Sequence, residues 1–283
     1  MVNKVVVSTD CVCDLPQELV DKYSIPIMYY YIQVGEAHFQ DMNEINSDCV
    51  LEYILQREKE ISTTCASVEE YREFFQKVSD HDKKTVIHIS IAEHVSKGYN
   101  NASEAAKDFS NVQVIDSGKL SGAMGLFVLV AADLAQKGAT KDIILQKLLG
   151  IGDKINCSFM MQSSQCREYN QKLNKVLIGL LETMSLHPII TMKNSNFSLA
   201  GLCLGNKYRR AVRYINRRLR NKEKISDEVL FIVLAGCDYD VRKCIEEEAK
   251  KQINWKHVYV LRASATISCN SGAGTFGMAY FNK

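Results

Sequence analysis

Apolar and polar positions alternate along the first half of the chain with the periods of strands and helices. Short runs of β-branched and aromatic residues predict strands, and longer segments with apolar residues three and four apart predict helices. The predicted strands are 5–8, 25–32, 85–90 and 112–116. The predicted helices are 17–23, 47–57, 67–78, 98–109, 124–136 and 140–150. This alternation is typical of a parallel, doubly wound sheet, so we expect an α/β fold.

The second half follows a different pattern and predicts a second α/β domain. Helices are expected near 208–220 and at 240–251, after an apolar segment at 176–181. Strands are expected at 229–234, 257–261, 265–268 and 278–281. We therefore divide the chain into an N-terminal domain, residues 1–150, and a C-terminal domain, residues 151–283.

Composition narrows the class of protein without specifying a function. The chain has 283 residues and a net charge of +2, so no global field points to nucleic acid or an anionic membrane. It lacks an apolar run of about 18 residues, so stable membrane insertion is not expected. Ten cysteines without a signal peptide indicate reduced thiols and a cytoplasmic protein. Cys11 and Cys13 lack a second ligand pair, which favours buried or loop cysteines over a metal site.

Three glycines near the end of the sequence, Gly272, Gly274 and Gly277, form the pattern G-x-G-x-x-G. In a dinucleotide site this pattern joins a strand to a helix and is followed by a second strand and an acidic residue. Only six residues follow Gly277, so the pattern is not a nucleotide site here. We expect the glycines to provide positive φ angles and close backbone approach in a tight loop.

The segment 207–224 contains nine Lys and Arg residues, with apolar residues at helical spacing. Such a segment is most often one solvated face of an amphipathic helix. The functional alternatives are a surface that binds anions or an acidic partner, and a surface that binds nucleic acid. Nucleic acid is least favoured, because one basic helix without interleaved aromatic residues is a weak footprint.

The sequence contains no nucleophile elbow, zinc-protease motif or phosphate-binding loop. His94 and Ser96 are two residues apart, a spacing that faces different ways on a helix, so they do not form an obvious catalytic pair. Hydroxyl and amide side chains do gather in three predicted loops, at 62–64, 96–101 and 270–271. Such groups can hold a carboxylate or phosphate through neutral hydrogen bonds, although each taken alone is more often a helix cap or a turn. An acyl-handling or nucleotide-dependent enzyme remains the alternative to a binding protein.

Taken in order, these loops resemble the DegV family of bacterial fatty-acid-binding proteins. The resemblance covers nearly the whole chain. Six segments carry it: Asp10 to Pro16, Thr63 to Ser67, Val95 to Ala102, Val114 to Ser117, His187 to Ile189, and Asn270 to Gly277.

The resemblance implies a two-domain fold with a Rossmann-like parallel sheet and a second α/β domain. It implies that a long-chain fatty acid lies in an apolar tunnel between the domains. It further implies a non-catalytic carrier, without a cofactor, that presents the carboxyl group to a fatty acid kinase. The positions that match the family's ligand-binding loops, or could assist them, are Thr63, Thr64, Ser96, Lys172, Arg209, Asn270, Ser271 and Gly272.

Two positions depart from the family pattern. Asn270 stands where the family has His, and an amide cannot carry charge near neutral pH. Lys172 stands where the family has Arg, which replaces a bidentate fork with a point charge. Arg209 or the neighbouring Arg210 could replace the lost guanidinium. We expect either a head-group site adapted to a different lipid or a weakened interaction with the kinase.

Overall fold

The first sheet is parallel and has helices on both faces. The computed structural model describes residues 5–56, 61–161, 186–193 and 195–283. The strand order is β2-β1-β6-β7. The strands are β1 (Val5–Asp10), β2 (Ile27–Met28), β6 (Thr85–Ser90) and β7 (Val112–Asp116). The predicted α/β class is confirmed for this part of the chain.

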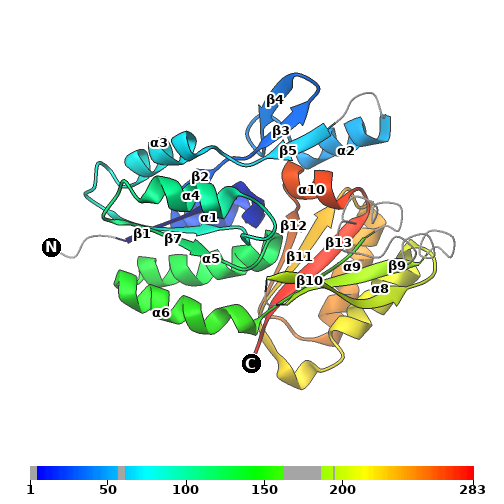
Figure 1. Ribbon diagram of the computed structural model, residues 1–283. Helices are drawn as coiled ribbons and strands as arrows, with labels where there is room; N and C mark the ends of the chain where they lie inside the picture. Colours follow the sequence, from blue (N-terminus) through cyan, green and yellow to red (C-terminus); the bar gives the residue numbers. More distant parts are fainter. Residues whose placement is uncertain (1–4, 57–60, 162–185, 194) are drawn as a thin grey trace.

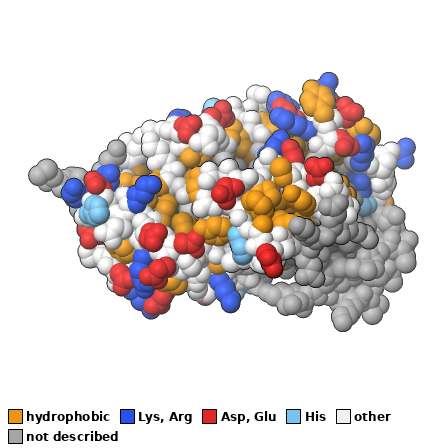
Figure 2. Space-filling model, turned by 90° about the horizontal axis from the view of Figure 1, so that it is seen from above, with side chains coloured by type: hydrophobic (Ala, Val, Ile, Leu, Met, Phe, Trp, Pro, Cys, Tyr) orange, Lys and Arg blue, Asp and Glu red, His pale blue; other side chains and the backbone are white. Residues whose placement is uncertain are grey.

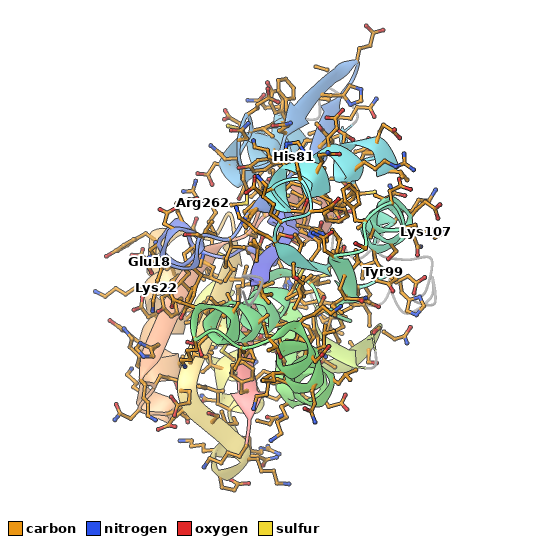
Figure 3. All side chains as sticks on the ribbon, turned by 90° about the vertical axis from the view of Figure 1, so that its left-hand side faces the viewer. Glu18, Lys22, His81, Tyr99, Lys107 and Arg262 are labelled. Atoms are coloured by element: carbon orange, nitrogen blue, oxygen red, sulfur yellow. The ribbon has the colours of Figure 1, made fainter. Side chains whose placement is uncertain are left out.

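Five helices surround this sheet. They are α1 (Gln17–Tyr23), α3 (Val68–Val78), α4 (Gly98–Ala106), α5 (Ser121–Gln136) and α6 (Lys141–Ile151). Helices α3 and α4 pack together on one face, while α1 and α5 lie on the other and α6 packs outside α5 (Figure 1). Figure 3 shows the same layering from the side, with Glu18 and Lys22 of α1 opposite Tyr99 of α4.

The second sheet is mixed and has the strand order β10-β9-β8-β13-β11-β12. Only β11 and β12 pair in parallel among these six strands. The strands are β8 (Ile155–Met160), β9 (His187–Lys193), β10 (Asn196–Cys203), β11 (Ile225–Ala235), β12 (His257–Arg262) and β13 (Thr275–Asn282). Helices α8 (Lys207–Arg218) and α9 (Tyr239–Gln252) pack against each other on its outer side (Figure 1).

Helix α5 lies between the two sheets. It contacts β1 of the first sheet and β8, β11 and β13 of the second. Its residues from Ser121 to Val128 are all buried, as expected for a helix that is apolar around its whole circumference. Gly122 and Gly125 permit the close approach: a Cβ on Gly122 would lie 2.8 Å from Val233 Cγ2.

A third, small sheet is formed by three strands from the N-terminal half of the chain. Its order is β4-β3-β5, with β3 (Tyr31–Val34), β4 (Ala37–Gln40) and β5 (Ile61–Thr64). Helices α2 (Ser47–Gln56) and α10 (Ala265–Ser271) pack together beside it. Helix α10 therefore joins residues from the end of the sequence to elements from its beginning (Figure 1).

Several predicted elements are wrong in type or extent. The single strand predicted at 25–32 is two strands in different sheets, β2 and β3. The predicted strand 265–268 is part of helix α10, and the predicted loop 62–64 is part of strand β5. Strands β8, β9 and β10 were not predicted, whereas 278–281 is confirmed as part of β13. Segment 176–181 lies outside the described residues, and the domain boundary near residue 150 stays a prediction.

Within the described part of the chain, no helix has the length and apolar character needed to cross a bilayer. Seen from above, the molecule carries hydrophobic side chains toward the middle of the face and charged side chains of both signs around them (Figure 2).

Candidate functional site

The C-terminal glycines form a turn from a helix into a strand. Gly272 and Gly274 have φ angles of 77° and 79°, and the Gly274 amide donates to the Ala235 carbonyl at 2.8 Å. A Cβ on Gly277 would lie 2.7 Å from the Ser158 carbonyl oxygen in the neighbouring strand. The expected positive φ angles and close backbone approach are thus confirmed. The order, α10 and then β13, is the reverse of a dinucleotide site.

Four of the predicted ligand-binding residues meet in one cleft of about 480 Å³. Thr63 and Thr64 come from β5, Ser96 precedes α4, and Asn270 lies on α10. Sequence reasoning assigned no role at this cleft to the other residues that line it. These are Tyr30, Cys65, Ile91, His94, Val95, Lys97, Leu120, Phe197, Thr266 and Ile267.

Asn270 is on a helix rather than in the predicted loop, and its amide is used to orient a neighbour. Its Nδ2 donates to Thr63 Oγ1 at 3.1 Å and to the Thr266 carbonyl at 2.8 Å. Because the Thr63 hydroxyl accepts this bond, its own proton is available to a ligand in the cleft. Asn270 therefore acts as a positioning residue for Thr63.

Two buried carboxylates from the N-terminal half hold the first turn of α10. Asp41 accepts from the backbone N–H groups of Ala265 and Thr266, both at 2.8 Å. Asp14 accepts from the Ser264 N–H at 2.8 Å and from the Ser121 hydroxyl. Burial raises the pKa of Asp14 to about 7, although these hydrogen bonds lower it. These contacts fix the position of α10, and with it Asn270.

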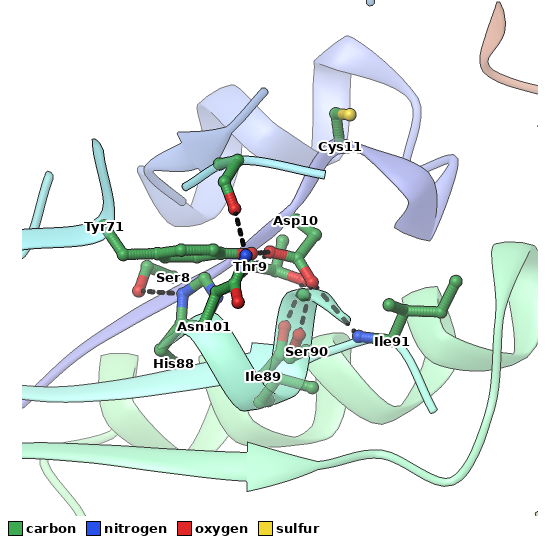
Figure 4. Close-up of polar contacts among 12 residues, drawn as sticks. Ser8, Thr9, Asp10, Cys11, Tyr71, His88, Ile89, Ser90, Ile91 and Asn101 are labelled. Atoms are coloured by element: carbon green, nitrogen blue, oxygen red, sulfur yellow. Dashed lines mark hydrogen bonds and ion pairs between the residues drawn. The ribbon is translucent and has the colours of Figure 1, made fainter. Parts of the chain in front are cut away.

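A buried polar network is centred on Asp10 (Figure 4), and it adjoins the cleft because Tyr30 and Ile91 both line the cleft and donate to Asp10. Asp10 accepts from the Tyr71 and Ser90 hydroxyls, both at 2.6 Å, and from the Tyr30 hydroxyl at 3.2 Å. His88 Nε2 lies 3.2 Å from the same carboxylate. Asp10 and His88 are fully buried, so this pair cannot act as an acid or base on a molecule in the cleft.

The network supports the cleft through Tyr30, whose ring lines it. Burial raises the pKa of Asp10. Hydrogen bonding and electrostatic attraction from His88, together with hydrogen bonds from the Ser90 and Tyr71 hydroxyls, lower the pKa by more than burial raises it, so the net shift is downward. Gly98 makes room for the Tyr30 hydroxyl, because a Cβ at residue 98 would lie 1.8 Å from that oxygen. The Gly98 amide also donates to Ser96 Oγ at 3.2 Å.

An apolar pocket of about 40 Å³ adjoins the cleft and lies between α5 and the second sheet. It shares Leu120 and Ile267 with the cleft. Its other lining residues include Phe159, Met278 and, in the first turn of α5, Gly122. A polar cleft and an apolar pocket therefore adjoin, with Leu120 and Ile267 between them.

The remaining predicted residues lie elsewhere. Ser271 lines the apolar pocket, and Gly272 is the buried turn residue behind it. Arg209 is exposed on α8 and does not line the cleft. Lys172 lies outside the described residues. The structure thus brings Thr63, Thr64, Ser96 and Asn270 together in the cleft, but not Ser271, Gly272 or Arg209.

The cysteines at the start of the chain are structural. Cys11 and Cys13 are both buried, which confirms the interpretation from sequence. Burial raises the pKa of the Cys13 thiol to about 12, so it stays protonated. Cys65 lines the cleft, where burial likewise raises the pKa of its thiol.

Comparison with known proteins agrees with this architecture. The family described as "Uncharacterised protein, DegV family" matches residues 4–283. A DegV domain-containing protein of Clostridium perfringens is 26% identical over 212 residues, which cover 72% of this chain and 74% of that protein.

Two solved structures share the fold. A DegV family protein from Thermus thermophilus, described with fatty acid binding, has a TM-score of 0.87 and 20% identity and covers 99% of this chain and 100% of its own. The fatty acid kinase B3 protein of Streptococcus pneumoniae, loaded with linoleic acid, has a TM-score of 0.82 and 16% identity, with 100% of each chain covered. Because the family match extends over almost every residue, this chain belongs to the DegV family.

Proposed function

We propose that this protein binds one long-chain fatty acid, with the carboxylate in the cleft and the tail in the apolar pocket. The observation that carries the proposal is that the polar cleft and the apolar pocket adjoin, because Leu120 and Ile267 line both. A molecule with one anionic end and a long apolar body matches this combination. The fatty acids bound by the Thermus thermophilus and Streptococcus pneumoniae proteins of the same fold support it.

The head group is held by neutral donors and one cation. Thr63 and Ser96 offer hydroxyl protons, and hydrogen bonds to charged groups contribute about 1.5–3 kcal/mol each. Lys97 lines the cleft and is exposed, and among the described residues that line the cleft none is Asp or Glu. Lys97 therefore supplies positive charge at a site where Asn270 has none.

Tail burial supplies most of the affinity, at about 0.8 kcal/mol per CH2 group. The apolar pocket is narrow, and 40 Å³ accommodates only about three water-sized spheres. Side chains along α5 and β13 must therefore separate as the tail enters. Met278 is suited to this, because its unbranched side chain adapts to irregular spaces at low cost.

We further propose that the protein carries the fatty acid to a kinase rather than transforming it. The Streptococcus pneumoniae protein of the same fold belongs to a fatty acid kinase, which supports this role. The cleft is open to solvent on the side of His94 and Lys97, both exposed, so a bound carboxylate would lie within reach of a second protein. Incubation with a fatty acid kinase subunit and ATP should yield acyl phosphate from the bound lipid.

Native mass spectrometry of the purified protein tests the binding step. We expect a fatty acid at about one per chain, or stoichiometric uptake of a labelled fatty acid by delipidated protein. A protein that is empty as purified and takes up no label would exclude the proposed function.

The double variant Thr63→Val and Ser96→Ala tests the head-group site. It should retain markedly less fatty acid, because two donors to a desolvated anion are removed. Ser62→Ala is the matched control: it lies on the same strand, is exposed, and contacts Gln33 rather than the cleft. Equal retention by the double variant and the control would refute the assignment.

A further inference from the structure

A second concave surface lies at the end of the second sheet remote from the cleft. It is a hollow of about 1110 Å³ where the end of α8 meets the end of β13, and we call it the basic hollow. Tyr280 and Asn282 of β13 line it, whereas the cleft lies near α10, before the start of that strand (Figure 1). It shares no lining residue with the cleft.

The basic hollow is strongly and unevenly charged. Six cationic residues line it against one acidic side chain, that of Glu223. The cations come from the last turns of α8, the segment that follows and the end of β13. They are Arg213, Arg217, Arg218, Arg220, Lys224 and Lys283. In a chain with a net charge of only +2, this is a local concentration of charge rather than a general property.

These cations are not neutralised within the described part of the chain. None of the six has an ion pair there, although Arg213 donates to the Leu204 carbonyl and Arg218 to Asn156, both at 2.6 Å. Arg218 Nε is buried and has no hydrogen-bond partner among the described residues.

The neighbouring helix α9 provides an internal comparison. Its lysines are paired with its own acids, as in Lys250 with Glu246 at 2.6 Å and Lys243 with Glu247 at 3.9 Å. Helix α8 contains no acidic residue at all. Like charges close together on a helix repel each other and destabilise it. The cations of α8 therefore differ from the lysines of α9 in having no acidic residue on their own helix to pair with.

The lining residues indicate the chemistry of a ligand. Four arginines present planar forks that match phosphate and carboxylate oxygens, and six positive charges require a multiply charged anion. The apolar and aromatic residues among the described lining are Ile225 and Tyr280, and both are buried. The Tyr280 hydroxyl donates to the Arg218 carbonyl at 3.0 Å. A nucleobase would therefore find no ring to stack on.

We propose that the basic hollow binds clustered phosphate groups, carried either by a soluble oligophosphate or by phospholipid head groups. The volume is slightly above the range of small-molecule sites, about 300–1,000 Å³, and suits several phosphates held side by side. The proposal does not depend on the fatty-acid site, because the two surfaces share no residue.

The test has two arms and one matched control. Binding of sodium tripolyphosphate is measured by calorimetry, and binding to vesicles of phosphatidylcholine with and without phosphatidylglycerol is measured by sedimentation. The double variant Arg217→Ala and Arg220→Ala removes two exposed cations of the hollow. Lys243→Ala with Lys250→Ala removes the same charge from α9 and leaves the hollow intact.

We expect binding at low salt that weakens at high salt, falls about tenfold or more in the arginine variant, and is unchanged in the lysine variant. A response to tripolyphosphate assigns a soluble ligand, and a response only to phosphatidylglycerol vesicles assigns lipid head groups. Absence of binding in both arms overturns the proposal, as does binding that both variants lose equally. Tighter binding of duplex DNA through the same arginines also overturns it, because the surface would then be a nucleic-acid site.

Discussion

Replacing Gly98 with alanine should destabilise the protein through one contact. The new Cβ would lie 1.8 Å from the Tyr30 hydroxyl oxygen and 2.9 Å from the ring carbon that bears it. Tyr30 is 2% exposed and cannot move aside without losing its hydrogen bond to Asp10. The backbone of Gly98 is not in the left-handed region, so the effect is steric alone.

The expected loss can be estimated from its parts. Overpacking costs about 1–3 kcal/mol, and losing a buried hydrogen bond to a charged group costs about 1.5–3 kcal/mol. A gain of at most about 1 kcal/mol in helix propensity offsets part of this. The free energy of unfolding, measured by urea denaturation, should therefore fall by about 1.5–6 kcal/mol.

Two variants make the reasoning testable. Gly150→Ala is the control, because residue 150 is exposed on α6 with no atom within 4 Å of the new Cβ. It should be neutral or stabilising by up to about 1 kcal/mol. Tyr30→Phe removes the clashing oxygen, so Gly98→Ala should cost less in that background. If Gly98→Ala is as stable as the native protein, or if its cost is the same with Phe at residue 30, the argument fails.

Three further predictions concern the contacts that position the site. The raised pKa of Asp14, about 7 against about 3.9 when unfolded, means that the folded state binds more protons between pH 4 and 7, so this group's contribution to stability declines as pH rises through that window. Asp14→Asn should consequently gain stability relative to the native protein between pH 5 and pH 8, and a pH-independent difference would contradict this. Asp41→Ala should lower the free energy of unfolding by about 2–4 kcal/mol in denaturant titrations, because two buried N–H groups of α10 lose their acceptor, whereas a change within error would show that water replaces it. Gly277→Ala should lower the thermal midpoint by several degrees, because its Cβ meets the Ser158 carbonyl at 2.7 Å, and an unchanged midpoint would show that β8 and β13 can part at no cost.

Local patterns predicted those elements whose apolar periodicity lies within their own sequence, even where the partner strand is distant, as β6 is from β1. The strand-helix alternation from β1 to α6 repeats at short range, so periodicity alone indicated the parallel sheet. The run 25–32 is uniformly apolar and aromatic, and it contains no signal that Tyr31 leaves the first sheet for the third. The Ile32 pairing partners in β4 and β5, which decide this, come later in the chain.

Helix α10 shows why the site was only partly predictable. Thr266 and Ile267 are β-branched and favour a strand by propensity. The helix forms because its first turn finds acceptors in Asp14 and Asp41, more than 220 residues away in the sequence. Ser264, whose side chain caps Ile267, was the one local signal of a helix start. The same distance explains why the Asn270–Thr63 contact could not be foreseen from either residue.

The tether between α10 and the two carboxylates has a consequence for synthesis and folding. During translation, Asp14 and Asp41 emerge long before residues 264–266, so both carboxylates must wait for the backbone N–H groups of α10 and its cap that they accept from in the finished fold. The cleft cannot be completed until β12 is in place and α10 docks beside β5. Contacts of such long sequence separation slow folding and make it cooperative across both halves. We therefore expect ligand binding to recover late in refolding. It should return together with the fully native state and after the parallel sheet has formed.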